Sequence, residues 1–266
     1  AHGHSLYDAA DIPALAEKVR AFSGGRIVLV IAGAPYKCPP APYECSMLLD
    51  DHLRERHLRD RTEITVLTVQ PLLMPNAGKD GSEWLAMQLD ARDISYRVGQ
   101  KVQRIEAGAI VLENETVPAD LIIAVPPHRV PKVVTDAGLA EEGTWIKVDA
   151  GSFETAHPDV FAIGDVVGVK LANGLPLPKS GGMAEAQGMC VASVIASREN
   201  PNVAARLFDG VGSCFLELGK SKAAKIEGHF LARPEPQIRF HEPAAVHAAA
   251  KHDWERTRLE EWFGDS

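Results

Sequence analysis

The 266-residue sequence has few cysteines, no excess of basic residues and no long apolar run. Its four cysteines, Cys38, Cys45, Cys190 and Cys214, are too few and too irregularly spaced for the disulfide framework of a secreted domain, so a reducing cytoplasmic compartment is expected. The formal net charge of −8 argues against a general nucleic-acid binder, because such proteins carry basic surfaces. No apolar run reaches the roughly 20 residues that a membrane-spanning helix needs. The composition is that of a globular protein with one large domain or two modest ones.

The sequence also lacks the glycine pattern of a dinucleotide site. The apolar run RIVLVIA at 26–32 predicts a buried strand, followed by a helix over 45–58 and a second strand at 63–69. This order indicates a parallel sheet. The loop after the first strand contains four prolines together with Tyr36 and Tyr43, where a dinucleotide site would have G-x-G-x-x-G. Because proline has no N–H to offer a pyrophosphate, we expect a Rossmann-like domain that does not bind NAD(P).

The remaining periodic segments complete an α/β fold. We expect a Rossmann-like, doubly wound parallel sheet with an antiparallel β-meander, because short alternating runs separated by turns fill the middle of the chain. The expected elements are a helix over 81–91, a meander over 101–117, a buried strand at 120–125, a hairpin from 206–219 and 222–230, an extended connector at 234–243 and an amphipathic helix over 244–263.

The most informative stretch runs from residue 155 to 188. The run 160–163 predicts a buried strand that ends at Gly164 and Asp165. A glycine lets a ligand approach the backbone, and an aspartate at the carboxyl end of a strand can accept a hydrogen bond from a ligand hydroxyl. Ser180 then predicts the N-cap of a helix over 183–197. The partial positive charge at that helix N-terminus suits an electron-rich ligand atom.

This stretch carries a family resemblance. The pattern T-x4-VFAIGD at 155–165 resembles the second FAD fingerprint of the pyridine nucleotide–disulfide oxidoreductase superfamily. The motifs PKSG and AEAQG within 178–188 are similar to those of one branch of this superfamily, the sulfide:quinone oxidoreductases and flavocytochrome c sulfide dehydrogenases. The resemblance implies FAD as the cofactor. It also implies roles for five residues: Gly164 and Asp165 at the ribityl chain, and Lys179, Ser180 and Gly181 at the isoalloxazine ring.

Two cysteines extend the resemblance. Cys38 in CPPAPYE and Cys214 in GVGSCFLELG resemble the redox-active cysteines of the same branch. The resemblance implies that they meet beside the flavin, oxidise a sulfide or thiol donor by way of a persulfide, and pass electrons through FAD to a quinone or haem acceptor. Lys37 would favour a Cys38 thiolate if the two approach. The alternative is a pair of small buried cysteines without redox chemistry, as expected for Cys45 and Cys190 inside helices.

The first FAD fingerprint of that superfamily, a strand leading into G-x-G-x-x-G, does not occur in the sequence. The third cysteine of the quinone-reducing members is also missing, since residues 1–37 contain none. We therefore expect the chain to correspond to the C-terminal two-thirds of a flavoenzyme. Its expected parts are a Rossmann-like middle domain over 1–145, the C-terminal half of an FAD-binding domain over 146–205, and a C-terminal hairpin and helix region over 206–266.

Two other functions stay open at this point. The first is an NAD(P)H-dependent flavoprotein reductase, against which the proline-filled loop argues. The second is a non-catalytic, flavoprotein-derived module that binds a partner or forms a homodimer, which the missing fingerprint favours. A helix with Trp254 and Trp262 can also lie on a membrane, so peripheral attachment to the inner membrane is the alternative to a purely cytoplasmic protein. No pattern predicts a metal site.

Overall fold

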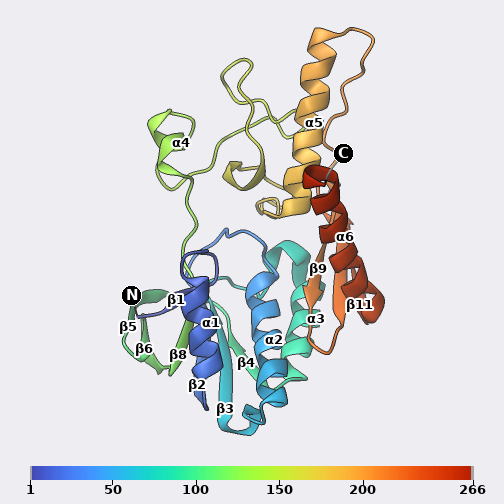
Figure 1. Ribbon diagram of the computed structural model, residues 1–266. Helices are drawn as coiled ribbons and strands as arrows, with labels where there is room; N and C mark the ends of the chain where they lie inside the picture. Colours follow the sequence, from blue (N-terminus) through green and yellow to red (C-terminus); the bar gives the residue numbers. More distant parts are fainter. Residues whose placement is uncertain (1, 265–266) are drawn as a thin grey trace.

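The computed structural model describes residues 2–264. The N-terminal half of the chain is built around a parallel sheet of five strands (Figure 1). The strand order is β1-β8-β2-β3-β4, and every neighbouring pair is parallel. The predicted α/β fold with a parallel sheet is confirmed. The strands are β1 (His4–Ser5), β2 (Gly25–Ile31), β3 (Thr62–Thr68), β4 (Ile94–Arg97) and β8 (Leu121–Val125).

Different elements cover the two faces of this sheet. Helices α1 (Ile12–Ala21), α2 (Ala41–Glu55) and α3 (Gly78–Asp90) pack on the face that carries Ile27, Leu29 and Ile31. The predicted meander covers the face that carries Val28 and Val30. Successive residues of β2 thus enter two different cores, which explains why the strand is apolar throughout. The meander strands are β5 (Val102–Glu106), β6 (Ala109–Leu112) and β7 (Thr116–Pro118).

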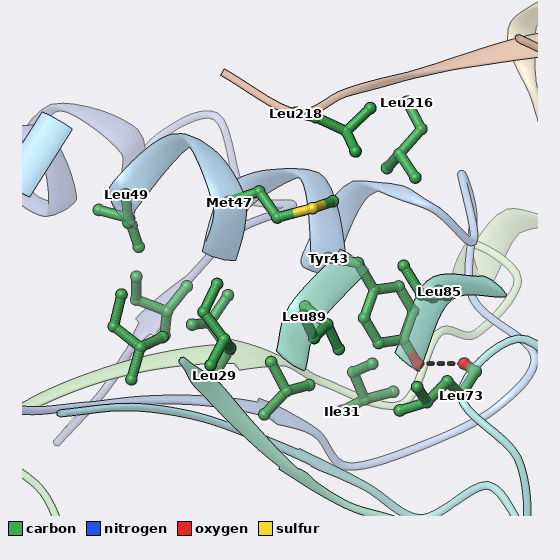
Figure 2. Close-up of a cluster of buried hydrophobic side chains, with 14 of the residues drawn as sticks. Leu29, Ile31, Tyr43, Met47, Leu49, Leu73, Leu85, Leu89, Leu216 and Leu218 are labelled. Carbon is green, nitrogen blue, oxygen red and sulfur yellow. Dashed lines mark hydrogen bonds between the residues drawn. The ribbon is translucent and has the colours of Figure 1, made fainter. Parts of the chain in front are cut away.

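Tyr43 lies within the core on the helical face (Figure 2). The sequence places it in the proline-rich loop, but it belongs to the first turn of α2 and is fully buried. Its hydroxyl donates a hydrogen bond to the main-chain oxygen of Leu73, so the buried polar atom is satisfied. Leu216 and Leu218, from the far end of the chain, join the same core. The C-terminal strand that carries them therefore packs against α2, which covers the first sheet.

The C-terminal region forms a three-stranded antiparallel sheet with the order β11-β10-β9. The predicted hairpin is confirmed as β9 (Val211–Glu217) and β10 (Ala223–His229). The prediction of a connector at 234–243 is wrong, because β11 (Gln237–Ala244) pairs with β10 and places Phe240 opposite Ile226. The edge position of β11 explains why it tolerates Pro243. The predicted final helix is confirmed as α6 (Ala245–Phe263).

A second core surrounds Phe153 and the long helix α5 (Gly181–Glu199). The prediction of a buried strand at 160–163 is wrong: Val160 and Ile163 are 37% and 38% exposed, and the segment makes only an isolated bridge, between Glu154 and Phe161. Among residues 2–264, no strand of a sheet lies next to this segment, so a ladder of main-chain hydrogen bonds cannot form. The predicted domain boundaries near 145 and 205 stay a prediction. The other short elements are α4 (Lys132–Asp136) and the 3₁₀ turns η1 (Arg59–Arg61), η2 (Pro75–Ala77) and η3 (Gly164–Val166).

Candidate functional site

Cys38 and Cys214 line one cavity, although they come from distant parts of the chain. Cys38 lies in the loop between β2 and α2, and Cys214 lies in the middle of β9. Both are free thiols. The cavity has a volume of about 40 Å³, and its walls are mainly apolar side chains: Met74, Met183, Ile226, Phe230 and Ile238. The structure thus brings together the two cysteines that the sequence singles out, whereas Cys45 and Cys190 lie elsewhere in α2 and α5.

Cys38 is fixed by its main chain. Its N–H donates to the main-chain oxygen of Lys179 at 2.5 Å, in a short parallel bridge between residues 37 and 179. Its carbonyl oxygen accepts from the N–H of Ala41 at 2.9 Å and from the hydroxyl of Tyr7 at 3.3 Å. Its φ of +48° lies in the left-handed region, which is uncommon for a residue with a side chain. Cys38 therefore links the first sheet to the segment that leads into α5.

Burial governs the acidity of both thiols. Burial, followed by the nearby Cys38 and Glu44, raises the pKa of Cys214 to about 12. Burial, followed by Glu44, also raises the pKa of Cys38, although the residue as a whole is exposed. Both thiols are thus protonated at neutral pH.

The cation that favours the Cys38 thiolate is Lys251 of α6, and it opposes the rise in the Cys38 pKa. The expected partner, Lys37, instead places its Nζ 5.7 Å from the centre of the Tyr7 ring. The Nζ of Lys251 lies 2.7 Å from Oε1 of Glu217 and 3.2 Å from Oε1 of Glu44. Burial lowers the pKa of Lys251, but these two carboxylates outweigh it and the pKa is raised. The sequence gives no signal for this lysine, because only the fold brings α6 to α2.

The N-terminus of α5 borders the same cavity, which Ser180 and Met183 also line. The predicted N-cap is confirmed: Oγ of Ser180 accepts from the N–H of Met183 at 3.4 Å. Gly181 and Gly182 begin the helix, and its first turn carries no acidic side chain. The unpaired N–H groups and partial positive charge of a helix start are therefore available to an electron-rich ligand.

Replacing Ser180 by alanine is expected to lower the free energy of unfolding by about 0.5–1 kcal/mol, because the cap of α5 is lost and its hydrogen bond is long. Urea titration of both proteins measures the difference. Ser197→Ala, inside the last turns of the same helix, is the matched control and is expected to change the free energy by less than about 0.5 kcal/mol. Equal losses in both variants would contradict the capping role.

Lys179 is buried, with 6% of its surface exposed. Its Nζ donates to the main-chain oxygens of Asp165 and Val167, each at 2.7 Å, and lies 3.8 Å from the centre of the Trp145 ring. Burial lowers the pKa of Lys179 to about 8, and the charge of Asp165 offsets part of this effect. Through these two hydrogen bonds Lys179 connects the η3 turn and the residue after it to the segment before α5. Its expected contact with an isoalloxazine ring stays a prediction.

Lys179 is expected to make stability depend on pH. Because its pKa is about 8 in the folded protein against an ordinary 10.5, the unfolded chain binds more protons between these values. The free energy of unfolding should therefore rise with pH in this window, by up to about 3 kcal/mol, relative to a Lys179→Met variant. Chemical unfolding at several pH values measures this difference. Lys147→Met removes an exposed lysine and should keep the wild-type profile; a Lys179→Met profile parallel to wild type would contradict the prediction.

Gly164 and Asp165 form the start of η3 rather than the end of a strand. Gly164 has a φ of +74°, which favours glycine, and its N–H donates to Oε1 of Gln187 on α5 at 2.6 Å. Asp165 is exposed, and its carboxylate has no hydrogen-bond or ion-pair partner within the described residues 2–264. This carboxylate can therefore accept a hydrogen bond from a ligand hydroxyl beside α5.

The described residues thus combine a parallel α/β sheet, an antiparallel meander, two thiols on one cavity and a glycine-rich start of α5. The chain belongs to the pyridine nucleotide-disulphide oxidoreductase family, whose sequence model matches residues 25–188.

The chain is similar to a sulfide:quinone oxidoreductase and to a sulfide-quinone reductase. It is 24% identical over 215 residues to the mitochondrial sulfide:quinone oxidoreductase of Dictyostelium discoideum, covering 77% of this chain and 46% of that protein. It is 26% identical over 224 residues to the sulfide-quinone reductase of Aquifex aeolicus, covering 77% and 50%. The chain thus spans about half the length of these relatives. The solved sulfide:quinone oxidoreductase of Aquifex aeolicus has the same fold, with a TM-score of 0.82 and 19% identity, and the match covers 100% of this chain and 69% of that one.

Proposed function

We propose that the chain forms the electron-entry side of an FAD-dependent, sulfide-oxidising enzyme. Electrons from a sulfide or thiol donor would pass through Cys38 and Cys214 to FAD, and from there to a quinone or haem acceptor. The observation that carries this proposal is the apolar cavity that both thiols share beside the N-terminus of α5. The two relatives support it, since their names state that they act on sulfide and quinone.

The residues that would hold FAD fit that group. The exposed carboxylate of Asp165 suits a hydroxyl-bearing chain, and the start of α5 at Gly181 suits an electron-rich ring edge. A Cβ added at Gly181 would meet only the far end of Trp254, at 3.9 Å, so a planar group can come close to the backbone there. When bound, FAD supplies an acceptor for the two electrons that the thiol pair releases.

The cysteines supply the sulfur chemistry. In the oxidised protein, hydrosulfide would attack a disulfide between Cys38 and Cys214, which leaves a persulfide on one cysteine and a thiolate on the other. Because the pKa of Cys214 is about 12, a thiolate formed there takes up a proton at neutral pH. The apolar cavity walls keep water away from the persulfide.

The first experiment is a visible absorption spectrum of the chain after addition of FAD and desalting. Retained flavin bands that sulfide bleaches without oxygen would support the proposal. Retained bands that sulfide leaves unchanged would contradict it, and bleaching by NADH would favour a reductase. If desalting removes the flavin, the sulfide test is made on the chain supplied together with an ADP-binding flavoprotein domain.

Contact with a membrane is a further part of this proposal. Leu259, Trp262 and Phe263 near the end of α6 are 52%, 58% and 77% exposed. Exposed aromatic side chains suit the boundary of a bilayer, where a quinone is available. Among the described residues 2–264, no helix is both long and apolar enough to cross a membrane. The compartment and a homodimer stay predictions.

A further inference from the structure

Two cavities of very different size lie next to each other at the cysteines. The one that Cys38 and Cys214 share has a volume of about 40 Å³. The other lies at the carboxyl ends of β2 and β3 and has a volume of about 460 Å³. We call the larger one the proline pocket, because six of its sixteen lining residues are prolines. Four residues line both cavities and so form a partition between them: Pro39, Met74, Asn76 and Pro178.

The size of the smaller cavity limits what can reach Cys214. Cys38 is exposed, so a sulfur donor can approach it from solvent, whereas Cys214 is less exposed and lines the smaller cavity. One water-sized group needs about 10–15 Å³, so this cavity has room for roughly three such groups. A hydrosulfide fits that space, but the carbon skeleton of an organic thiol does not. The proline pocket has room for such a skeleton, provided that the molecule can extend through the partition.

Other walls of the smaller cavity have protein directly behind them. Met183, in the first turn of α5, lies over the main chain of Gly212, since a Cβ added at Gly212 would meet the thioether of Met183. Ile226 and Phe230 are 4% and 5% exposed and belong to the two large cores. Because protein interiors are close-packed, these walls cannot retreat to admit a larger group. The partition differs, because the proline pocket leaves open space on its far side.

Within the partition, Met74 is the side chain that can move. The rings of Pro39 and Pro178 are rigid, and the amide Nδ2 of Asn76 donates a hydrogen bond to the main-chain oxygen of Pro176. Met74 is 3% exposed, so its side chain is packed inside the protein. That side chain is unbranched and has three rotatable bonds, so it can change shape while its main chain stays in place. The width of the partition therefore depends on Met74.

We propose that Met74 is a specificity-determining residue that closes the partition and limits Cys214 to sulfur donors of about the size of hydrosulfide. An organic thiol or disulfide reaches Cys214 only when the Met74 side chain turns toward the proline pocket. This inference rests on the proposed function, because it concerns which sulfur donors reach the thiols. Its test requires no flavin, so its failure is distinguishable from a failure of the proposed function.

Methanethiosulfonate probes of two sizes, methyl and benzyl, test the partition. The Cys214 thiolate attacks the sulfur that carries the organic group, a new S–S bond forms, and methanesulfinate leaves. All proteins carry Cys38→Ser, so that no adduct on residue 38 fills the cavity, and mass spectrometry measures the rate at Cys214. The benzyl rate divided by the methyl rate should be at least about 10-fold lower for this parent protein than for a small free thiol, because the larger group does not fit.

Met74→Ala should raise this ratio by about 10-fold and change the methyl rate by less than about 3-fold, because it joins the two cavities. Leu73→Ala is the matched control: Leu73 is also 3% exposed but lines neither cavity, so the ratio should stay unchanged. If Met74→Ala does not fold, Met74→Val shortens the side chain with a smaller loss of volume and should raise the ratio by a smaller factor. A parent ratio equal to that of the free thiol, a folded Met74 variant with the parent ratio, or an equal rise in Leu73→Ala would overturn the proposal.

Discussion

Replacing Cys38 by serine is expected to slow the reduction of bound FAD by sulfide by roughly 1,000-fold or more, because a serine hydroxyl can neither form a persulfide nor exchange with a disulfide. Cys214→Ser should have a similar effect, since the two thiols line one cavity and the proposed route uses both of them. Stopped-flow absorbance of the flavin, without oxygen, measures both rates. The double variant should lose little more than either single one, as expected for residues that act as a unit.

Cys45→Ala provides the matched control for these variants. Cys45 lies in α2, a few residues after Cys38 in the chain, but it does not line the cavity that Cys38 and Cys214 share. Its removal should leave the rate of flavin reduction within a few-fold of wild type. A sulfide-driven rate that survives in Cys38→Ser, or that falls equally in Cys45→Ala, would show that the shared cavity is not the point of electron entry.

Asp50→Ala is expected to lower the free energy of unfolding by about 3–5 kcal/mol, the largest stability effect that we anticipate. Asp50 is 4% exposed and accepts from Nε of Arg59 at 2.5 Å and from Nε of Arg54 at 2.9 Å. Arg59 also donates to the main-chain oxygens of Thr62, Arg92 and Asp93, so it cannot turn to solvent without losing these bonds. Removing the carboxylate leaves a buried guanidinium without its counter-charge.

Guanidinium chloride titration measures this loss. Asp253→Ala removes the carboxylate of an exposed pair with Arg256, in which the side chains are 70% and 61% exposed, and should change the free energy by less than about 0.5 kcal/mol. Comparable losses in Asp50→Ala and Asp253→Ala would contradict the stabilising role of the buried pair.

Local patterns in the sequence predict much of the fold. The apolar runs that became β2 and β3, the meander and the capped start of α5 are specified by neighbouring residues, so their prediction needs no knowledge of distant contacts. The segment 160–163 shows the limit. It has the composition of a buried strand, but a strand also needs a neighbour to pair with, and its only pairing is one bridge. The reverse holds for β11, where the prolines at 234 and 243 suggest a connector although β10 lies beside the segment.

The residues of the candidate site also divide into those that a local motif predicts and those that only the fold brings together. Cys38 and Cys214 are recognisable by their local motifs, and the N-cap Ser180 by its position before a helix. Lys251, Glu44 and Glu217 carry no such motif, because their association depends on how α6, α2 and β9 meet.

The cavity between Cys38 and Cys214 is formed by segments that lie far apart in the sequence and are therefore synthesised at different times. Cys38 and its loop emerge early, with the first strands of the parallel sheet, whereas β9 and β10 emerge after α5. Until the hairpin docks Leu216 on the first core, no wall of β9 residues stands opposite Cys38. A nascent or truncated chain without that hairpin therefore lacks one wall of the cavity, so the proposed electron entry through both cysteines would require the hairpin to dock first.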